Sequence, residues 1–462
     1  MSFNRRKFMQ YAGLAAMATV VKAQARDFNV MDFGAVGDGV ALDTAAIQKA
    51  IDTAAASGTR ARVLLPGGKR FLTGSLALKS GIDFHLAGDA LLLASTDPAH
   101  YAAQTPGVLL AEKAVGLKIS GSGRIDGQAM KFMTAYSTTD ERWEPLPFRP
   151  RIFHLAGCTD LEIGGITFSH APQWGLFMLG CERVLVDGIT IRNHFDVPNC
   201  DGIDPDRCRD VEIRNCDIEC ADDGIVIKAG EGTESYGPAR NIVVKDCKVK
   251  TRDAGLKIGT ETWGDISKVR FERCKVLTGG RGPTITHRHG GEIHDIEFND
   301  IEVVAEHHAP RWWGWGEAVS LTVWPRVAGE KVGRLYDIRL RNIRGRAENS
   351  IRIDGDKDNP IEDVLLDHVA MRIDRWTQYP GGKFDNRPTG PDRLGLEPHR
   401  TPVFSLRNAH RVTLRDCQAQ WGENLQEYFG SALEAENVKQ LSLTRFQGEA
   451  AHPERDEAIV IL

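Results

Sequence analysis

The sequence has neither a strong excess of positive charge nor long hydrophobic runs beyond its N-terminus. The 462 residues carry a formal net charge of −5, which argues against a strongly basic nucleic-acid-binding protein. After the N-terminal segment, no stretch approaches the ~18 consecutive apolar residues that a transmembrane helix needs. We therefore expect no nucleic-acid partner and no membrane span.

Cysteine spacing typical of a zinc site is also absent. The nine cysteines include no CxxC pair, so we do not expect a metal cluster. Because nine is odd, at least one cysteine is unpaired if all disulfides are internal. Cys216, Cys247 and Cys274 each follow the same strand-like phrase, and we expect them to stack as small apolar residues rather than to form disulfides.

Residues 1–25 (MSFNRRKFMQYAGLAAMATVVKAQA) have the pattern of an export signal. Arg5 and Arg6 are followed by an apolar stretch from Tyr11 to Val21 and by a small-x-small cleavage site. The paired arginines favour a twin-arginine signal and its export machinery, with an ordinary Sec signal as the alternative. We expect a mature periplasmic or extracellular protein with one catalytic domain over residues 26–462.

A strand-like phrase recurs along the chain. It appears at 184–186, 211–213, 242–244, 269–271 and 296–298 among other places. Steps of about 27 residues are in the range of solenoids and propellers. A propeller would need about four strands in a repeat of ~40–50 residues. Short strands with period-2 patterning and no long helices between them instead predict an all-β parallel β-helix.

One amphipathic helix is predicted before the repeats begin. Apolar residues with helical spacing lie between Ala46 and Ala54. Asp43 is a good N-cap and Gly58 a good stop signal. This helix could cap the open end of the solenoid. The segment VLLPGGKRFLTGSLAL that follows reads as the first strands.

Aligning the coils brings three aspartates together. The residues that precede the small position of each second strand should stack; they are Asp201, Asp223, Ala254, Arg281, Glu317 and Asn349. Asp201 and Asp223 should thus lie one coil apart, ~5 Å between strands, with Asp222 adjacent. Close carboxylates hold one proton to higher pH, and inverting glycosidic cleavage needs a protonated acid beside an ionised base. The alternative is that these are solvated Asp-Gly turns.

A second column of side chains should point out of the coils. It contains Asp204, Lys257, Thr284, Ser320 and Arg352, one step after the apolar column that fills the core.

On these motifs the chain resembles the polygalacturonase family, glycoside hydrolase family 28, within the pectate-lyase-like right-handed β-helices. NCDGID and ADDGIVIK match its two aspartate motifs, while ISGSGRIDGQ and SHAPQWGLFMLGCERVLVDGITI match earlier coils. The resemblance implies a right-handed, single-stranded parallel β-helix and hydrolysis with inversion. It implies Asp222 as the general acid and Asp201 and Asp223 as the groups that activate water, with no metal or organic cofactor.

Two departures from the family pattern concern substrate binding. The family's Gly-His-Gly falls at Asp253-Ala254-Gly255, and its Arg-Ile-Lys falls at Thr284-Ile285-Thr286. Replacement cations for a uronate carboxylate could be Lys257, Lys228, Arg281 and Arg352. Further candidates for sugar contacts are His287, Arg288, His289 and Trp313, the last within a cluster that includes Trp312, Trp315 and Trp324. Solvated lysines and a packed loop core are the alternatives.

The sequence thus predicts a secreted glycoside hydrolase that acts on a pectic or related uronate-containing polysaccharide or oligosaccharide. A lyase or epimerase on the same fold and a non-catalytic glycan-binding solenoid remain open at this point. The Gly- and Pro-rich insertion 374–395 could cover one end of the cleft or be a plain surface loop.

Overall fold

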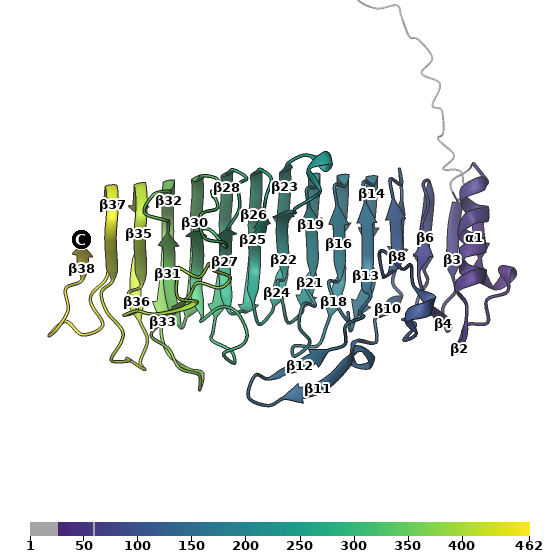
Figure 1. The fold of residues 1–462 in the computed structure, drawn as a ribbon, viewed down its shortest axis with the longest axis horizontal. Coiled ribbons are helices and arrows are strands. Elements are labelled where there is room, and N and C mark those ends of the chain that lie inside the picture. Colours follow the sequence, from purple (N-terminus) through teal and green to yellow (C-terminus); the bar gives the residue numbers. More distant parts are fainter. Residues whose placement is uncertain (1–25, 59–60) are drawn as a thin grey trace, which may run out of the picture.

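The computed structural model describes residues 26–58 and 61–462, so the expected export signal lies outside the described residues. The chain forms an elongated parallel β-helix (Figure 1), in which 34 strands are linked by parallel pairings between successive coils. Strand β16 (Leu176–Leu179) pairs with β19 (Ile203–Asp206), and β19 pairs with β22 (Ile225–Ala229). The predicted parallel β-helix is confirmed.

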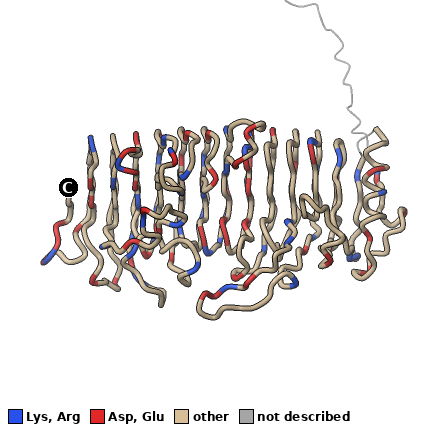
Figure 2. The backbone as a smooth tube through the Cα atoms, in the orientation of Figure 1, with Lys and Arg blue, Asp and Glu red and all other residues tan. Residues whose placement is uncertain are grey.

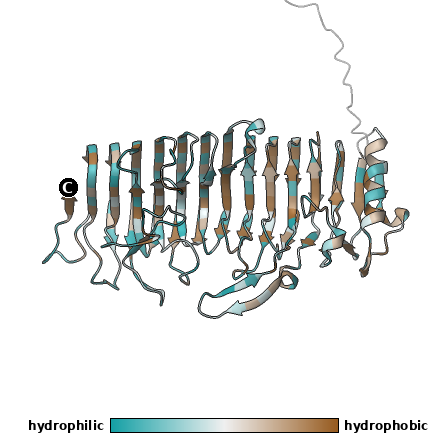
Figure 3. Cartoon of the chain, viewed as in Figure 1, coloured by the Kyte–Doolittle hydropathy of each residue, from teal (hydrophilic) through white to brown (hydrophobic). Residues whose placement is uncertain are grey.

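Period-2 patterning explains how each coil fills its core. In β20 (Arg209–Arg214), Val211 and Ile213 are buried, while Glu212 between them is half-buried and faces outward, as alternation on a strand requires. Figure 3 shows this as hydrophobic and hydrophilic bands that alternate along the strands. Each inward side chain stacks on its counterpart in the next coil.

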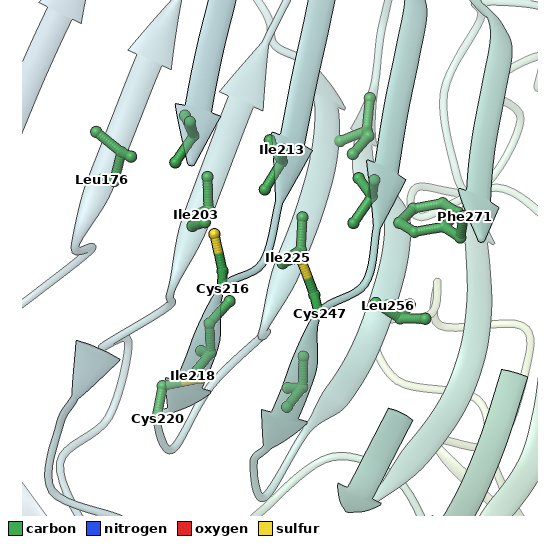
Figure 4. Packing of buried hydrophobic residues seen from close by; sticks show 14 of the residues in the cluster. Leu176, Ile203, Ile213, Cys216, Ile218, Cys220, Ile225, Cys247, Leu256 and Phe271 are labelled. Atoms are coloured by element: carbon green, nitrogen blue, oxygen red, sulfur yellow. The ribbon is translucent and has the colours of Figure 1, made fainter. Parts of the chain in front are cut away.

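The stacked core is continuous through the central coils (Figure 4). Leu176, Ile203, Ile225 and Leu256 occupy equivalent positions of four successive coils, and all four are fully buried. The later coils use longer strands of the same kind. These are β26 (Ile266–Thr278), β28 (Ile293–Ala305), β30 (Leu335–Ala347) and β32 (Ile361–Ile373).

The predicted N-terminal cap is present as helix α1 (Thr44–Ala56), which buries Ile47, Ala50, Ile51 and Ala54 at the first coils. Asp43 is its N-cap residue, but its carboxylate accepts hydrogen bonds from the N–H groups of Val36 (2.7 Å) and Gly37 (3.1 Å) instead of capping the helix. The helix is confirmed, and Asp43 anchors the preceding loop.

The first coil also contains strands that the sequence did not signal. Strands β1 (Arg26–Asn29) and β2 (Asp38–Leu42) precede α1 and pair with the coil that follows it. The expected strands after the helix are β3 (Ala61–Leu65), β4 (Arg70–Thr73) and β5 (Leu76–Ala77). No helix in the described part of the chain is long and apolar enough to cross a membrane.

All nine cysteines lie in the described residues, and all are free and buried. Cys216 and Cys247 point into the core between aliphatic side chains (Figure 4). The prediction that they stack as small apolar residues is confirmed.

Two insertions leave the coils and pack along one side of the solenoid. The first is a hairpin of β11 (Met133–Ser137) and β12 (Arg142–Pro145). The second contains β33 (Lys383–Asp385) and β34 (Leu396–Pro398). In Figure 1 the hairpin runs below the central coils, and Figure 2 shows that it carries charges of both signs. Of the two insertions, only the hairpin contributes a residue, Arg142, to the candidate site described below.

Candidate active site

Three aspartates meet where two neighbouring strands begin. Asp201 precedes β19, and Asp222 and Asp223 precede β22; these strands pair through Ile203 and Ile225. Carboxylate oxygens of the three residues lie within 4.8 Å of one another. The coil register therefore brings the residues together as the alignment predicted.

The cluster is not a set of solvated turns. The side chains of Asp201 and Asp223 are only 3% and 5% exposed, whereas Asp222 is half-buried. The N–H groups of Asn199 (3.2 Å) and Asp223 (3.0 Å) donate to the two oxygens of the Asp222 carboxylate and hold it in place. Asp222 is the most accessible of the three acids.

Two of the predicted cations are part of this cluster. Lys257 Nζ lies 2.7 Å from Asp223 Oδ2. Lys228 Nζ lies 2.8 Å from Asp204 Oδ1 and 3.6 Å from Asp201 Oδ2. Both lysines are buried, so each neutralises a carboxylate at short range.

Burial and mutual repulsion shift the buried acids Asp201, Asp223 and Asp253 toward their protonated forms. Burial raises the pKa of Asp201 well above its ordinary value, and the charges of Asp204 and Asp222 raise it further. Burial also raises the pKa of Asp223, to about 6, although Lys257 opposes the shift. The pKa of Asp253 is raised well above its ordinary value by burial and by the charge of Asp223. Such a cluster can hold a proton donor and a proton acceptor side by side near neutral pH.

The acids form the floor of a cleft of about 240 Å³ whose walls include Trp174, Trp313 and Glu261. Lys228 Nζ lies 4.1 Å from the centroid of the Trp174 ring, which fixes that wall. A larger hollow of about 470 Å³ lies on another face, over strands that contain Arg183 and Asp160. These two residues already form an ion pair at 2.7 Å. The smaller cleft has the chemistry of a catalytic site, namely clustered acids beside aromatic rings.

Two predicted arginines are not brought to the cleft. Arg281 is 2% exposed and lies 3.3 Å from Asp385 Oδ2 and 3.7 Å from Glu317 Oε2. Arg352 is fully buried and binds Asp354 (2.5 Å) and Asn386 Oδ1 (2.6 Å). Their guanidinium groups hold the insertion 374–395 against the coils, so their substrate contact stays a prediction that this burial opposes.

The polar stretch at 287–289 is likewise internal. His287 is fully buried, with ring nitrogens 3.0 Å from Thr262 Oγ1 and 2.8 Å from the Gly333 carbonyl oxygen. Arg288 donates to the carbonyl of Pro388 (2.8 Å). His289 stacks on Trp263 with 4.3 Å between ring centroids. None of these three residues, His287, Arg288 and His289, lines the cleft.

Of the predicted tryptophan cluster, Trp312 and Trp313 line the cleft. Trp315 and Trp324 are buried in the loop core. Trp315 stacks on His307 at 4.1 Å, and Trp324 carries the Arg393 guanidinium 3.8 Å from its ring centroid. One segment thus contains rings that line the cleft and rings that pack in the loop core.

The insertion 374–395 covers the outward column rather than the cleft. Asp385 is buried and does not line the cleft. It accepts a hydrogen bond from the Gly314 N–H (2.7 Å). Thr284, Ser320 and Arg352 of that column are buried. Side chains that leave the coil here meet a loop instead of water.

Seven cleft residues were missed by the sequence interpretation; they are Arg142, Trp174, Asn199, Asp253, Thr260, Glu261 and Arg311. Asp253 could have been predicted from the sequence, because it directly precedes Ala254, which stacks with Asp201 and Asp223. Trp174 lies in the quoted segment SHAPQWGLF, but a single aromatic residue in a turn gives no orientation. Arg142 comes from an inserted hairpin, whose position the coil repeat cannot predict.

Comparison with known proteins agrees with this architecture. A family model described as Glycosyl hydrolases family 28 matches residues 56–309, which is more than half of the chain. The chain belongs to this family. The family resemblance that the aspartate motifs carried is thereby confirmed.

Two curated relatives share part of this chain. A probable polygalacturonase from Vitis vinifera is 29% identical over 249 residues, covering 49% of this chain and 50% of that protein. An exo-poly-alpha-D-galacturonosidase from Dickeya chrysanthemi is 27% identical over 275 residues, covering 47% of this chain and 44% of that protein. The chain spans about half the length of the curated relatives it matches.

A solved exopolygalacturonase from Thermotoga maritima has a similar fold. It superposes with a TM-score of 0.64 at 22% identity and covers 76% of this chain and 88% of that one. At this identity the likeness concerns the fold alone, and it agrees with the predicted right-handed parallel β-helix.

Proposed function

We propose that this protein hydrolyses glycosidic bonds of a pectic, galacturonate-containing polysaccharide or its oligosaccharides. The observation that carries the proposal is the cluster of Asp201, Asp222 and Asp223 on the floor of an aromatic-walled cleft, in a chain of family 28. The names of the curated relatives, which are polygalacturonases, support the choice of substrate class.

Asp222 is the proposed general acid because it is the accessible member of the cluster. It would give its proton to the glycosidic oxygen as the bond to the anomeric carbon breaks. A water would attack that carbon and release a proton to whichever of Asp201 and Asp223 is ionised. The products are two shorter saccharides, one with a new reducing end.

Unpaired oxygens support the role of the other two aspartates. Asp201 Oδ1 and Asp223 Oδ1 are buried and have no hydrogen-bond partner among the residues that the structure describes. Buried carboxylate oxygens normally accept hydrogen bonds, so these two oxygens have unused acceptor capacity next to Asp222. Lys257 holds the other oxygen of Asp223 at 2.7 Å, which keeps this group oriented.

Inversion is the stereochemistry that we propose, and it rests on the family resemblance. The carboxylate oxygens lie within 4.8 Å of one another, whereas the two carboxyl groups of inverting enzymes are typically about 6.5–9.5 Å apart. Spacing alone would favour retention. The anomer that forms first distinguishes inversion from retention.

Trp174 and Trp313 are the proposed sugar platforms. Both line the cleft beside the aspartates, and aromatic rings stack on the apolar C–H faces of sugars. Lys228 and Lys257 line the same cleft and act mainly through the acids that they neutralise.

We also propose export by a cleaved twin-arginine signal at residues 1–25, with residues 26–462 as the mature periplasmic or extracellular catalytic domain. The support is the sequence pattern alone. N-terminal sequencing of protein recovered from the periplasm tests it. A mature chain that begins near Arg26 is the expected result, and an intact Met1 terminus in the cytoplasm would contradict it.

The alternative function is a lyase in which Lys257 would act as the base. The surroundings of this lysine weigh against that role. Burial lowers the pKa of Lys257, but the charges of Asp223 and Asp253 outweigh this effect and leave the pKa above its ordinary value. A base has to be deprotonated near the working pH, and Lys257 stays protonated there.

Product analysis separates the possibilities. The mature protein is incubated with polygalacturonate and with rhamnogalacturonan, with and without a chelator. New reducing ends without ultraviolet absorbance, unchanged by the chelator, would support hydrolysis. Absorbance from unsaturated uronates would show a lyase, and binding without products would show a glycan-binding solenoid.

A further inference from the structure

The cleft needs a cation for an acidic sugar, and the cations expected from the sequence are already neutralised. Lys257 is paired with Asp223, and Lys228 with Asp204. Arg281 and Arg352 are bound to carboxylates beneath the insertion 374–395. A uronate carboxylate that enters beside the aspartates would be repelled by them, and none of these four groups has a free charge to offer.

Arg142 differs from these cations. Its side chain comes from strand β12 of the inserted hairpin and lines the cleft together with Asp201, Asp222 and Asp223. It is half-buried, and its Nε is buried without a hydrogen-bond partner in the described part of the chain. No carboxylate of the described residues lies within ion-pair distance of its guanidinium group, whereas Arg311 on the same cleft binds Glu144 at 2.5 Å.

The hairpin holds Arg142 in place through its neighbours. Glu141 lies 3.0 Å from Arg252 Nη1 and accepts a hydrogen bond from the Tyr379 hydroxyl. The Arg142 guanidinium lies 5.6 Å from the ring centroid of Trp312. Anchored on both sides in this way, the guanidinium loses little freedom on binding a ligand.

We propose that Arg142 binds the carboxylate of a uronate unit in the cleft and thereby makes the site selective for acidic sugars. A guanidinium forms paired hydrogen bonds with a carboxylate and stays charged when half-buried. Arg142 thus supplies the positive charge that the threonines at the family's Arg-Ile-Lys position, Thr284 and Thr286, lack. This inference rests on the proposed function for its substrate class.

The test compares an acidic substrate with its neutral counterpart. Turnover of an oligogalacturonide and of its fully methyl-esterified form is measured as kcat/KM for wild type, Arg142→Gln and Arg142→Lys. We expect Arg142→Gln to lower kcat/KM for the acid by about 10- to 100-fold, the loss of a charge-assisted pair. The ester should change by less than about 3-fold, and Arg142→Lys should lie between wild type and Arg142→Gln because it keeps the charge and loses the paired geometry.

Arg311→Gln is the matched control, because it removes an equal charge from the same cleft but one that is already paired. It should change the acid and the ester by the same factor. Equal changes for Arg142→Gln on both substrates, with wild-type turnover intact, would overturn the inference and leave the proposed function standing. Thermal denaturation verifies that each variant is folded.

A binding arm separates failure of this inference from failure of the proposed function. Trigalacturonate is titrated calorimetrically into Asp222→Asn and into Asp222→Asn/Arg142→Gln. A dissociation constant about 10-fold or more higher in the double variant supports Arg142 as the carboxylate site, even if the wild type cleaves no galacturonan. An unchanged constant, or no binding by Asp222→Asn itself, would overturn it.

Discussion

Lys257 Nζ lies 2.7 Å from Asp223 Oδ2, although the two residues are 34 positions apart in the sequence. They belong to neighbouring coils, where Lys257 follows the start of β25 (Ala254–Thr262) and Asp223 precedes β22. Both side chains are buried. The lysine is thus an internal partner of Asp223, one of the two groups proposed to activate water, and this relationship makes its effect on the reaction predictable.

Removal of Lys257 should shift the pH profile. Lys257 lowers the pKa of Asp223, which burial raises to about 6. In Lys257→Met the opposing charge is lost, so this pKa should rise and the acid limb of kcat/KM should move to higher pH. If Lys257 bound the uronate carboxylate, as the sequence suggests, Lys257→Met would lower kcat/KM for uronate substrates specifically. The ion pair with Asp223 instead predicts equal losses of kcat/KM on acidic and neutral substrates. An unshifted acid limb would exclude a link between Lys257 and catalysis through Asp223.

Asp222→Asn should abolish turnover without unfolding the protein. The side chain is half-buried and bound only by two backbone N–H groups, so the isosteric amide fits with little structural change. Loss of general acid catalysis typically costs about 10²–10⁴-fold in rate. Steady-state kinetics and circular dichroism would check this prediction, and near-wild-type hydrolysis would reject Asp222 as the acid.

Asp201→Asn should stabilise the protein at neutral pH. The pKa of Asp201 is raised well above its ordinary value in the folded state, so between the unfolded and folded pKa values the folded chain binds more protons. The free energy of unfolding therefore falls as pH rises through this window. The amide removes that loss, while Lys228 keeps Asp204 as its partner.

We expect the melting temperature of Asp201→Asn to exceed that of wild type by about 1–3 °C at pH 7, with a smaller difference at pH 4. Calorimetry at both pH values measures it. A melting temperature below that of wild type at pH 7 would mean that the charged form of Asp201 stabilises the fold.

Asp385→Ala should loosen the insertion that covers the outward column. Asp385 accepts from Arg281, Arg387 and the Gly314 N–H. Its removal takes away the shortest ion pair of the buried Arg281 guanidinium and leaves the longer pair with Glu317 at 3.7 Å. Breaking a buried pair in this way costs about 3–5 kcal/mol. The readouts are the melting temperature and limited proteolysis within 374–395, and a double variant Asp385→Leu/Arg281→Met should recover part of the loss. Wild-type stability of Asp385→Ala would show that Glu317 alone compensates the charge of Arg281.

The aspartate cluster could be predicted from the sequence because two periods fix it. Strand alternation decides which side chains leave the coil, and the coil repeat decides which of them are neighbours. Asp201 and Asp223 follow from these periods, and so do the core positions of Ile203 and Ile225.

The rest of the site depends on insertions that the periods do not describe. The sequence pattern at an outward position such as Arg352 is the same whether water or a loop lies over the side chain. Here Asn386 of the insertion 374–395 accepts a hydrogen bond from Arg352 and covers it. Arg142 reaches the cleft from a hairpin whose sequence has no relation to the coil repeat. Loop packing, rather than strand register, decides which of the cations are available to a substrate.

The central claim is that the aspartates cleave glycosidic bonds by direct attack of water, and an α-linked galacturonan is the test substrate. Proton NMR of the products during the first turnovers tests it most directly, because it distinguishes the anomers before they equilibrate. The account predicts that the β anomer appears first and that no unsaturated uronate forms. The α anomer first would indicate a covalent intermediate and overturn the roles given to Asp201 and Asp223, and signals of an unsaturated uronate would show that the protein is a lyase.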